Sequence, residues 1–114
     1  MAITLDIARK EVAELLKNNR FVQLNASWCP DCVYTQSVFR KYDVIDKVKF
    51  FEIGQYRRGT PEFDNYYLAF QEAANKKNLP LIFADGKFIA TEHTFHDWES
   101  TKVLKHKFKE LGLL

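Results

Sequence analysis

The chain contains two cysteines, Cys29 and Cys32, which are separated by Pro30 and Asp31. Two thiols at this spacing can form a reversible disulfide or supply half of the ligands of a zinc ion. An apolar run over residues 21–24 predicts a strand before the pair, and the proline predicts the first turn of a helix at it. A helix amino terminus stabilises a thiolate, which is the species that attacks disulfides.

The spacing therefore predicts dithiol exchange with Cys29 as the nucleophile. Cys32, one turn into the helix on nearly the same face, is predicted to resolve the mixed disulfide formed at Cys29. We expect Trp28, Pro30 and Asp31 to tune the site. The Asp31 carboxylate should oppose thiolate formation and make the site more reducing, although it also suits the first turn of any helix.

The sequence gives less support to two other roles of the cysteine pair, a zinc site and a structural disulfide. A zinc site needs two further ligands, for which the sequence offers three histidines (His93, His96 and His106) and the carboxylates, but no second cysteine pair. A structural disulfide would close a very short loop and stabilise the fold little. We expect no bound metal.

Hydrophobic periodicity and turn residues predict the elements that position the pair. Helices are expected over residues 6–18, 30–41, 60–78 and 94–112, and strands over residues 21–24, 48–53, 81–84 and 87–90. Asp85 and Gly86 suit a two-residue hairpin turn between the last two strands. The order αβαβαββα implies an α/β fold with a four-stranded mixed sheet and helices on both faces, in a single domain over residues 1–114.

Composition excludes several classes of function. The 17 basic and 15 acidic residues are mixed along the 114-residue chain, which does not make a nucleic-acid-binding stripe. No apolar run approaches the length of a membrane span. Acidic residues within the first twenty positions suit neither a secretory signal nor an organellar presequence. We expect a cytoplasmic monomer that binds neither nucleic acid nor membrane.

The string from Trp28 to Cys32 and the order of elements resemble the dithiol glutaredoxins of the thioredoxin-like superfamily over nearly the whole chain. The resemblance implies a glutathione-disulfide oxidoreductase with glutathione as reducing co-substrate, no bound cofactor, and disulfide-containing proteins or small disulfides as partners. Leu79-Pro80 corresponds to the family's Val-Pro, whose proline is cis. By analogy the backbone of Leu79 faces Cys29 and pairs with a bound glutathione or peptide.

Several positions depart from that family. Ala26 stands where a lysine often binds a glutathione carboxylate, and Ala90-Thr91 replaces paired glycines. His93-Thr94 replaces a polar pair directed at the γ-glutamyl end, and Arg57 and Arg58 are candidates to restore carboxylate binding. We therefore expect weak glutathione-dependent activity.

One further departure from the glutaredoxins and one difference from the thioredoxins concern the dithiol site. Asp31 stands where the family typically has tyrosine, and Gln23 stands where thioredoxins place a buried aspartate for proton transfer.

Two alternative functions remain open. One is a thioredoxin-like reductase of protein disulfides that is independent of glutathione, and the other is a non-enzymatic metal-binding or scaffold module.

Overall fold

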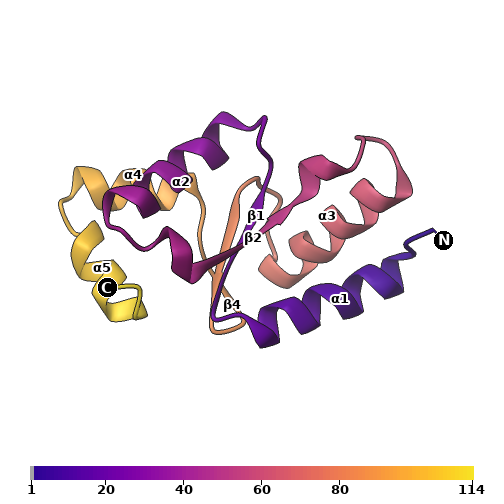
Figure 1. The fold of residues 1–114 in the computed structure, drawn as a ribbon, viewed down its shortest axis with the longest axis horizontal. Coiled ribbons are helices and arrows are strands. Elements are labelled where there is room, and N and C mark those ends of the chain that lie inside the picture. Colours follow the sequence, from indigo (N-terminus) through magenta and orange to yellow (C-terminus); the bar gives the residue numbers. More distant parts are fainter. Residues whose placement is uncertain (1) are drawn as a thin grey trace.

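A computed structural model describes residues 2–114 and places a four-stranded sheet between two layers of helices (Figure 1). The elements are α1 (Leu5–Asn18), β1 (Phe21–Asn25), α2 (Pro30–Lys41), η1 (Ile45–Lys47), β2 (Val48–Glu52), η2 (Ile53–Gln55), α3 (Pro61–Ala74), β3 (Leu81–Ala84), β4 (Lys87–Ala90), α4 (Glu92–Ser100) and α5 (Leu104–Leu111). All four predicted strands and the first three predicted helices are present.

The strand order is β2-β1-β3-β4, with β1 parallel to β2 and antiparallel to β3. A parallel neighbour needs a crossover connection, and α2 supplies it between β1 and β2. The hairpin of β3 and β4 turns at Asp85 (φ 52°) and Gly86 (φ 80°), which are the left-handed conformations that this dipeptide adopts readily. The predicted mixed sheet is confirmed.

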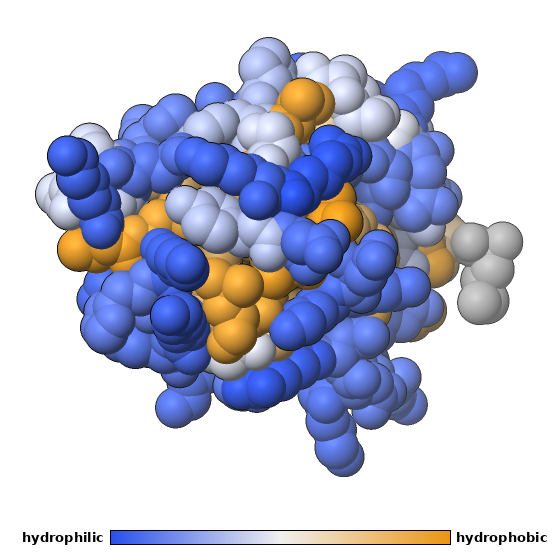
Figure 2. Space-filling model, turned by 60° about the vertical axis from the view of Figure 1, so that its left-hand side comes forward, coloured by the Kyte–Doolittle hydropathy of each residue, from blue (hydrophilic) through white to orange (hydrophobic). Residues whose placement is uncertain are grey.

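Each face of the sheet has its own hydrophobic core. Val22 and Leu24 of β1 belong to the core shared with α1 and α3, whereas Phe21 belongs to the core shared with α2, α4 and α5. The second core is rich in aromatic rings, with Phe39 of α2 at its centre. With the α4 and α5 side brought forward, Figure 2 shows mostly hydrophilic residues with apolar patches between them.

The carboxyl-terminal segment differs from the prediction of one helix over residues 94–112. The first of its two helices begins at Glu92, before the predicted start at residue 94, because a capping box forms there: the Thr91 hydroxyl accepts from His93 N and the Thr94 hydroxyl accepts from Thr91 N. The helix then breaks after Ser100, where the hydroxyls of Ser100 and Thr101 donate to a backbone carbonyl.

The break between α4 and α5 includes Lys102 in a left-handed conformation with φ 61°. It allows Phe95 of α4 and Leu104 and Phe108 of α5 to enter the same core. Tertiary packing therefore overrides a continuous helical pattern that contains no internal proline or glycine.

The third helix also ends earlier than the predicted boundary near Asn78. Its last residue is Ala74, because Asn75 adopts a left-handed conformation (φ 52°) that asparagine tolerates at a helix end. Lys76 N then donates to the Gln71 carbonyl at 3.2 Å. The early end releases residues 75–80 as the loop that reaches the cysteine pair.

Candidate active site

The cysteine pair lies at the amino terminus of α2, as the sequence predicts. Cys29 is the N-cap residue with extended backbone, Pro30 occupies the first helical turn, and the Cys29 carbonyl accepts from Val33 N at 3.0 Å. No side chain caps this helix end. Its backbone N–H groups and dipole are therefore available to negative charge at the site.

The two thiols differ in their access to solvent. Both are free, but Cys32 is fully buried, whereas Cys29 keeps 7% of its surface exposed. The Sγ of Cys29 lies 3.7 Å from the carbonyl oxygen of Leu79, and the Leu79–Pro80 peptide is cis. The structure thus agrees with both features that the glutaredoxin resemblance implied for this loop.

Burial raises the pKa of the Cys32 thiol well above its usual value. A hydrogen bond with the Ala26 backbone opposes this rise, whereas Cys29 and the Glu52 carboxylate add to it. Cys32 is therefore protonated at neutral pH, and it must lose a proton before it can attack another sulfur.

The raised pKa of Cys32 predicts a loss of stability at alkaline pH. An unfolded thiol ionises near pH ~8.5, whereas the buried one stays protonated, so the unfolded state gains stability as pH rises above that value. In reduced Cys29→Ser protein, this thiol should cost about 2 kcal/mol of unfolding free energy between pH 7 and pH 10.

Urea denaturation under a reducing agent measures that change. The Cys29→Ser/Cys32→Ala double variant is the matched control, because it removes only the titrating thiol and keeps every other ionisable group. An identical pH dependence of stability in the two variants would contradict the assignment.

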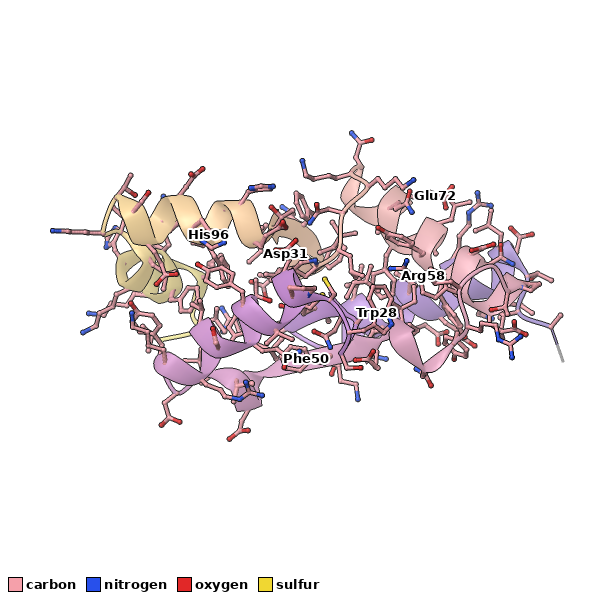
Figure 3. The ribbon with its side chains drawn as sticks, turned by 90° about the horizontal axis from the view of Figure 1, so that it is seen from above. Trp28, Asp31, Phe50, Arg58, Glu72 and His96 are labelled. Atoms are coloured by element: carbon pink, nitrogen blue, oxygen red, sulfur yellow. The ribbon has the colours of Figure 1, made fainter. Side chains whose placement is uncertain are left out.

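A pocket of about 450 Å³ opens beside Cys29. It is lined by Trp28, Cys29, Arg58, Gly59, Phe63, Asp64, Tyr67 and Leu79. The Arg58 guanidinium lies over the Trp28 ring, 4.0 Å from its centroid, which is favourable cation–π geometry. Figure 3 shows Trp28 and Arg58 side by side.

The structure brings together only part of the predicted site. Trp28, Arg58 and Leu79 join Cys29 at the pocket, whereas Arg57 is exposed and does not line it. His93 is also exposed and lies 3.6 Å from the Glu92 carboxylate. The hydroxyl of Thr94 is used in the capping box of α4.

Three positions at which this chain differs from the usual glutaredoxin residues have structural roles that the sequence did not reveal. Ala26 and Ala90 are fully buried, and Thr91 is buried with its hydroxyl engaged at the amino terminus of α4. None of the three lines the pocket. The side chains that replace the paired glycines at Ala90 and Thr91 are therefore buried in the fold and are not presented to solvent.

Sequence reasoning missed four pocket residues: Gly59, Phe63, Asp64 and Tyr67. A signal existed for two of them, since Phe63 and Tyr67 are aromatic residues four positions apart within the third predicted helix, a spacing that places both on one helical face. Periodicity indicates a buried face but does not distinguish a core from a pocket wall.

Within residues 2–114, no three side chains of histidine, cysteine, aspartate or glutamate gather in a way that could hold a metal ion. Over the same residues, every helix is too short or too polar to cross a bilayer.

The sheet topology, the dithiol at the start of α2 and the cis proline opposite it define a thioredoxin-like fold of the glutaredoxin type. No protein-family model matches the sequence. Glutaredoxin-8 of Saccharomyces cerevisiae is 42% identical over 101 residues, which cover 89% of this chain and 91% of the yeast protein. The chain belongs to the glutaredoxin family.

Solved structures agree with this assignment. The solution structure of yeast dithiol glutaredoxin Grx8 matches with a TM-score of 0.84 and 39% identity, over 94% of this chain and 96% of that one. Oxidised glutaredoxin 2 from Chlamydomonas reinhardtii matches with a TM-score of 0.78 and 20% identity, over 97% and 99% of the two chains. A buckwheat glutaredoxin–glutathione complex matches with a TM-score of 0.75 and 18% identity, over 96% and 94%.

Proposed function

We propose that the protein reduces protein disulfides and glutathione mixed disulfides by dithiol exchange. The Cys29 thiolate attacks one sulfur of the substrate disulfide, whose other sulfur leaves as a thiolate and takes up a proton. Cys32 then loses its proton and attacks Cys29 Sγ, which releases the second substrate thiol and leaves a Cys29–Cys32 disulfide. Two glutathione thiols restore the dithiol and become glutathione disulfide.

The observation that carries this proposal is the unequal access of the two sulfurs. Cys29 lines the pocket, whereas Cys32 is fully buried behind it. A substrate from solvent can therefore reach only Cys29. Cys32, one helical turn further along α2, can reach a disulfide formed at Cys29 without the substrate entering the core.

Glutathione as the electron donor is supported by the family and by the pocket. A related buckwheat protein has been solved as a glutaredoxin–glutathione complex. In this chain Arg58 is the cation that lines the pocket, and it can bind a ligand carboxylate. Position 26 contributes no cation there, so we propose that glutathione is used weakly. We further propose that the protein acts as a cytoplasmic monomer without a bound cofactor.

The choice of electron donor is tested by comparing two coupled assays on one mixed-disulfide substrate. Glutathione with glutathione reductase should support turnover, at a rate below that of a typical dithiol glutaredoxin. Turnover with thioredoxin reductase alone would favour the thioredoxin-like alternative. Absence of turnover with either donor would favour a non-enzymatic module.

Replacing Arg58 should weaken glutathione use specifically. A hydrogen bond to a charged group contributes roughly 1.5–3 kcal/mol, and solvent exposure of Arg58 reduces that contribution. We expect Arg58→Gln to raise the KM for glutathione about fivefold with a small change in kcat. Steady-state kinetics in the glutathione-coupled assay measures both constants.

Arg57→Gln is the matched comparison, because it removes the same charge from the neighbouring residue outside the pocket. Its KM should stay within about twofold of the unmodified protein, as expected for a solvated surface charge. Equal increases in KM for the two variants would show that general charge, and not the pocket contact, governs glutathione binding.

A further inference from the structure

A network of polar side chains lies beside the active-site loop, which is residues 26–29 between β1 and α2. The network ends at Glu52, which pairs with Asn25 where β1 and β2 end. One carboxylate oxygen, Oε1, accepts from Asn25 Nδ2 at 2.8 Å. The other, Oε2, accepts from Ser27 N at 2.9 Å and Gly54 N at 3.1 Å. Glu52 has no salt-bridge partner within residues 2–114. One of its three donors is thus the loop backbone two residues before Cys29.

The network continues from Asn25 to the helix that carries Cys32. The Asn25 Oδ1 accepts from Gln23 Nε2 at 2.9 Å and from Gln36 Nε2 at 2.7 Å. The Gln23 Oε1 in turn accepts from the Thr35 hydroxyl at 2.9 Å, and that hydroxyl is also 3.0 Å from the Cys32 carbonyl. Side-chain contacts therefore join the carboxylate to the first turns of α2.

At position 52 both terminal atoms of the side chain must accept hydrogen bonds, because donors approach each carboxylate oxygen. A carboxylate only accepts hydrogen bonds, whereas a glutamine in its place would turn an NH₂ group toward at least one of the three donors. The observed position of the Glu52 side chain also depends on glycine at position 54. A Cβ atom there would lie 2.3 Å from Glu52 Oε2 and 3.0 Å from Trp28 Nε1, so glycine permits the close approach of both side chains.

The carboxylate also contributes charge behind the dithiol. Its negative charge adds to the rise in the pKa of the Cys32 thiol, so it disfavours the thiolate that Cys32 must form before it attacks the Cys29 sulfur. Other charged or titratable groups near the thiols are Asp31, which is exposed in the first turn of the same helix, and Arg58 and Tyr67 at the pocket. These groups are unchanged when Glu52 alone is replaced.

We propose that Glu52 is a positioning residue of the dithiol site, which holds the loop before Cys29 against the end of β2 and sets the redox balance of the Cys29–Cys32 pair. The inference rests on the proposed function, because it requires the pair to cycle between dithiol and disulfide. Glu52 acts through the loop and the network and does not contact the substrate.

The test equilibrates the protein with glutathione redox buffers, in which one glutathione disulfide oxidises the dithiol and two glutathione thiols form. Glu52→Gln should loosen the loop that holds Cys29 in position for the disulfide, and we expect the equilibrium to shift about tenfold toward the dithiol, which for a two-electron couple is about 30 mV. Amide hydrogen exchange at Ser27 should become faster. Glu110→Gln, the same charge change on α5, should alter neither value.

Gly54→Ala separates position from charge, because it displaces the carboxylate without removing it. We expect faster exchange at Ser27 and slower turnover, with a smaller change in equilibrium than in Glu52→Gln. This variant also carries the test if Glu52→Gln fails to fold, and unchanged exchange and turnover in it would overturn the inference.

The proposed function and the proposed role of Glu52 can be disproved separately. If the unmodified protein forms no Cys29–Cys32 disulfide in any buffer, the proposed function is wrong. If that disulfide forms, but its equilibrium and the Ser27 exchange rate are the same after Glu52→Gln, only the role of Glu52 is wrong.

Discussion

Cys29→Ser should abolish disulfide reduction, whereas Cys32→Ser should form stable mixed disulfides with its substrates. Cys29 is the thiol that lines the pocket, and the only other thiol of the chain is fully buried. Without Cys29 no sulfur can begin exchange. Without Cys32 the first step proceeds, but the intramolecular attack that releases the second substrate thiol is lost.

Two measurements check these expectations on a glutathionylated protein substrate. Turnover in the coupled assay should fall to background for Cys29→Ser, and mass spectrometry should detect an adduct at Cys29 in Cys32→Ser. A Cys32→Ser variant that is equally inactive and yields no adduct would show that the two roles are wrongly assigned.

Phe39→Ala should destabilise the fold by about 3–5 kcal/mol, the usual cost of removing a buried phenylalanine ring. The Phe39 side chain is 1% exposed and contacts three other rings: Phe50 of β2, Phe95 of α4 and Phe108 of α5. Its removal leaves a cavity where α2 meets the carboxyl-terminal helices. This loss is a large fraction of the stability of an ordinary small domain.

Urea denaturation of the reduced protein measures this loss. Phe39→Leu keeps most of the apolar volume and should cost clearly less than Phe39→Ala. Phe63→Ala, in the other core, is a useful comparison, because it should disturb the pocket wall without opening the α2 interface. A cost below about 1 kcal/mol for Phe39→Ala would contradict the central place of this ring.

Much of the local structure is predictable from residues close together in the chain. Thr60 and Pro61 begin α3, where the Thr60 hydroxyl accepts from Phe63 N at 3.3 Å, and Asp85-Gly86 makes the hairpin turn. Such signals succeed because helix caps and tight turns depend on the backbone conformation of a few adjacent residues. The same reasoning failed at the break near Lys102, because the burial of two helices against one core decided it.

The candidate site divides in the same way. The sequence by itself determined the dithiol, its place between a strand and a helix, and the family resemblance, because these depend on spacing along one segment. Only the tertiary structure decided which arginine reaches the pocket, since Arg57 and Arg58 are adjacent and chemically identical. It also decided that Glu52 supports the loop before Cys29. Contacts between distant segments depend on how the sheet and helices pack, and no local pattern records that geometry.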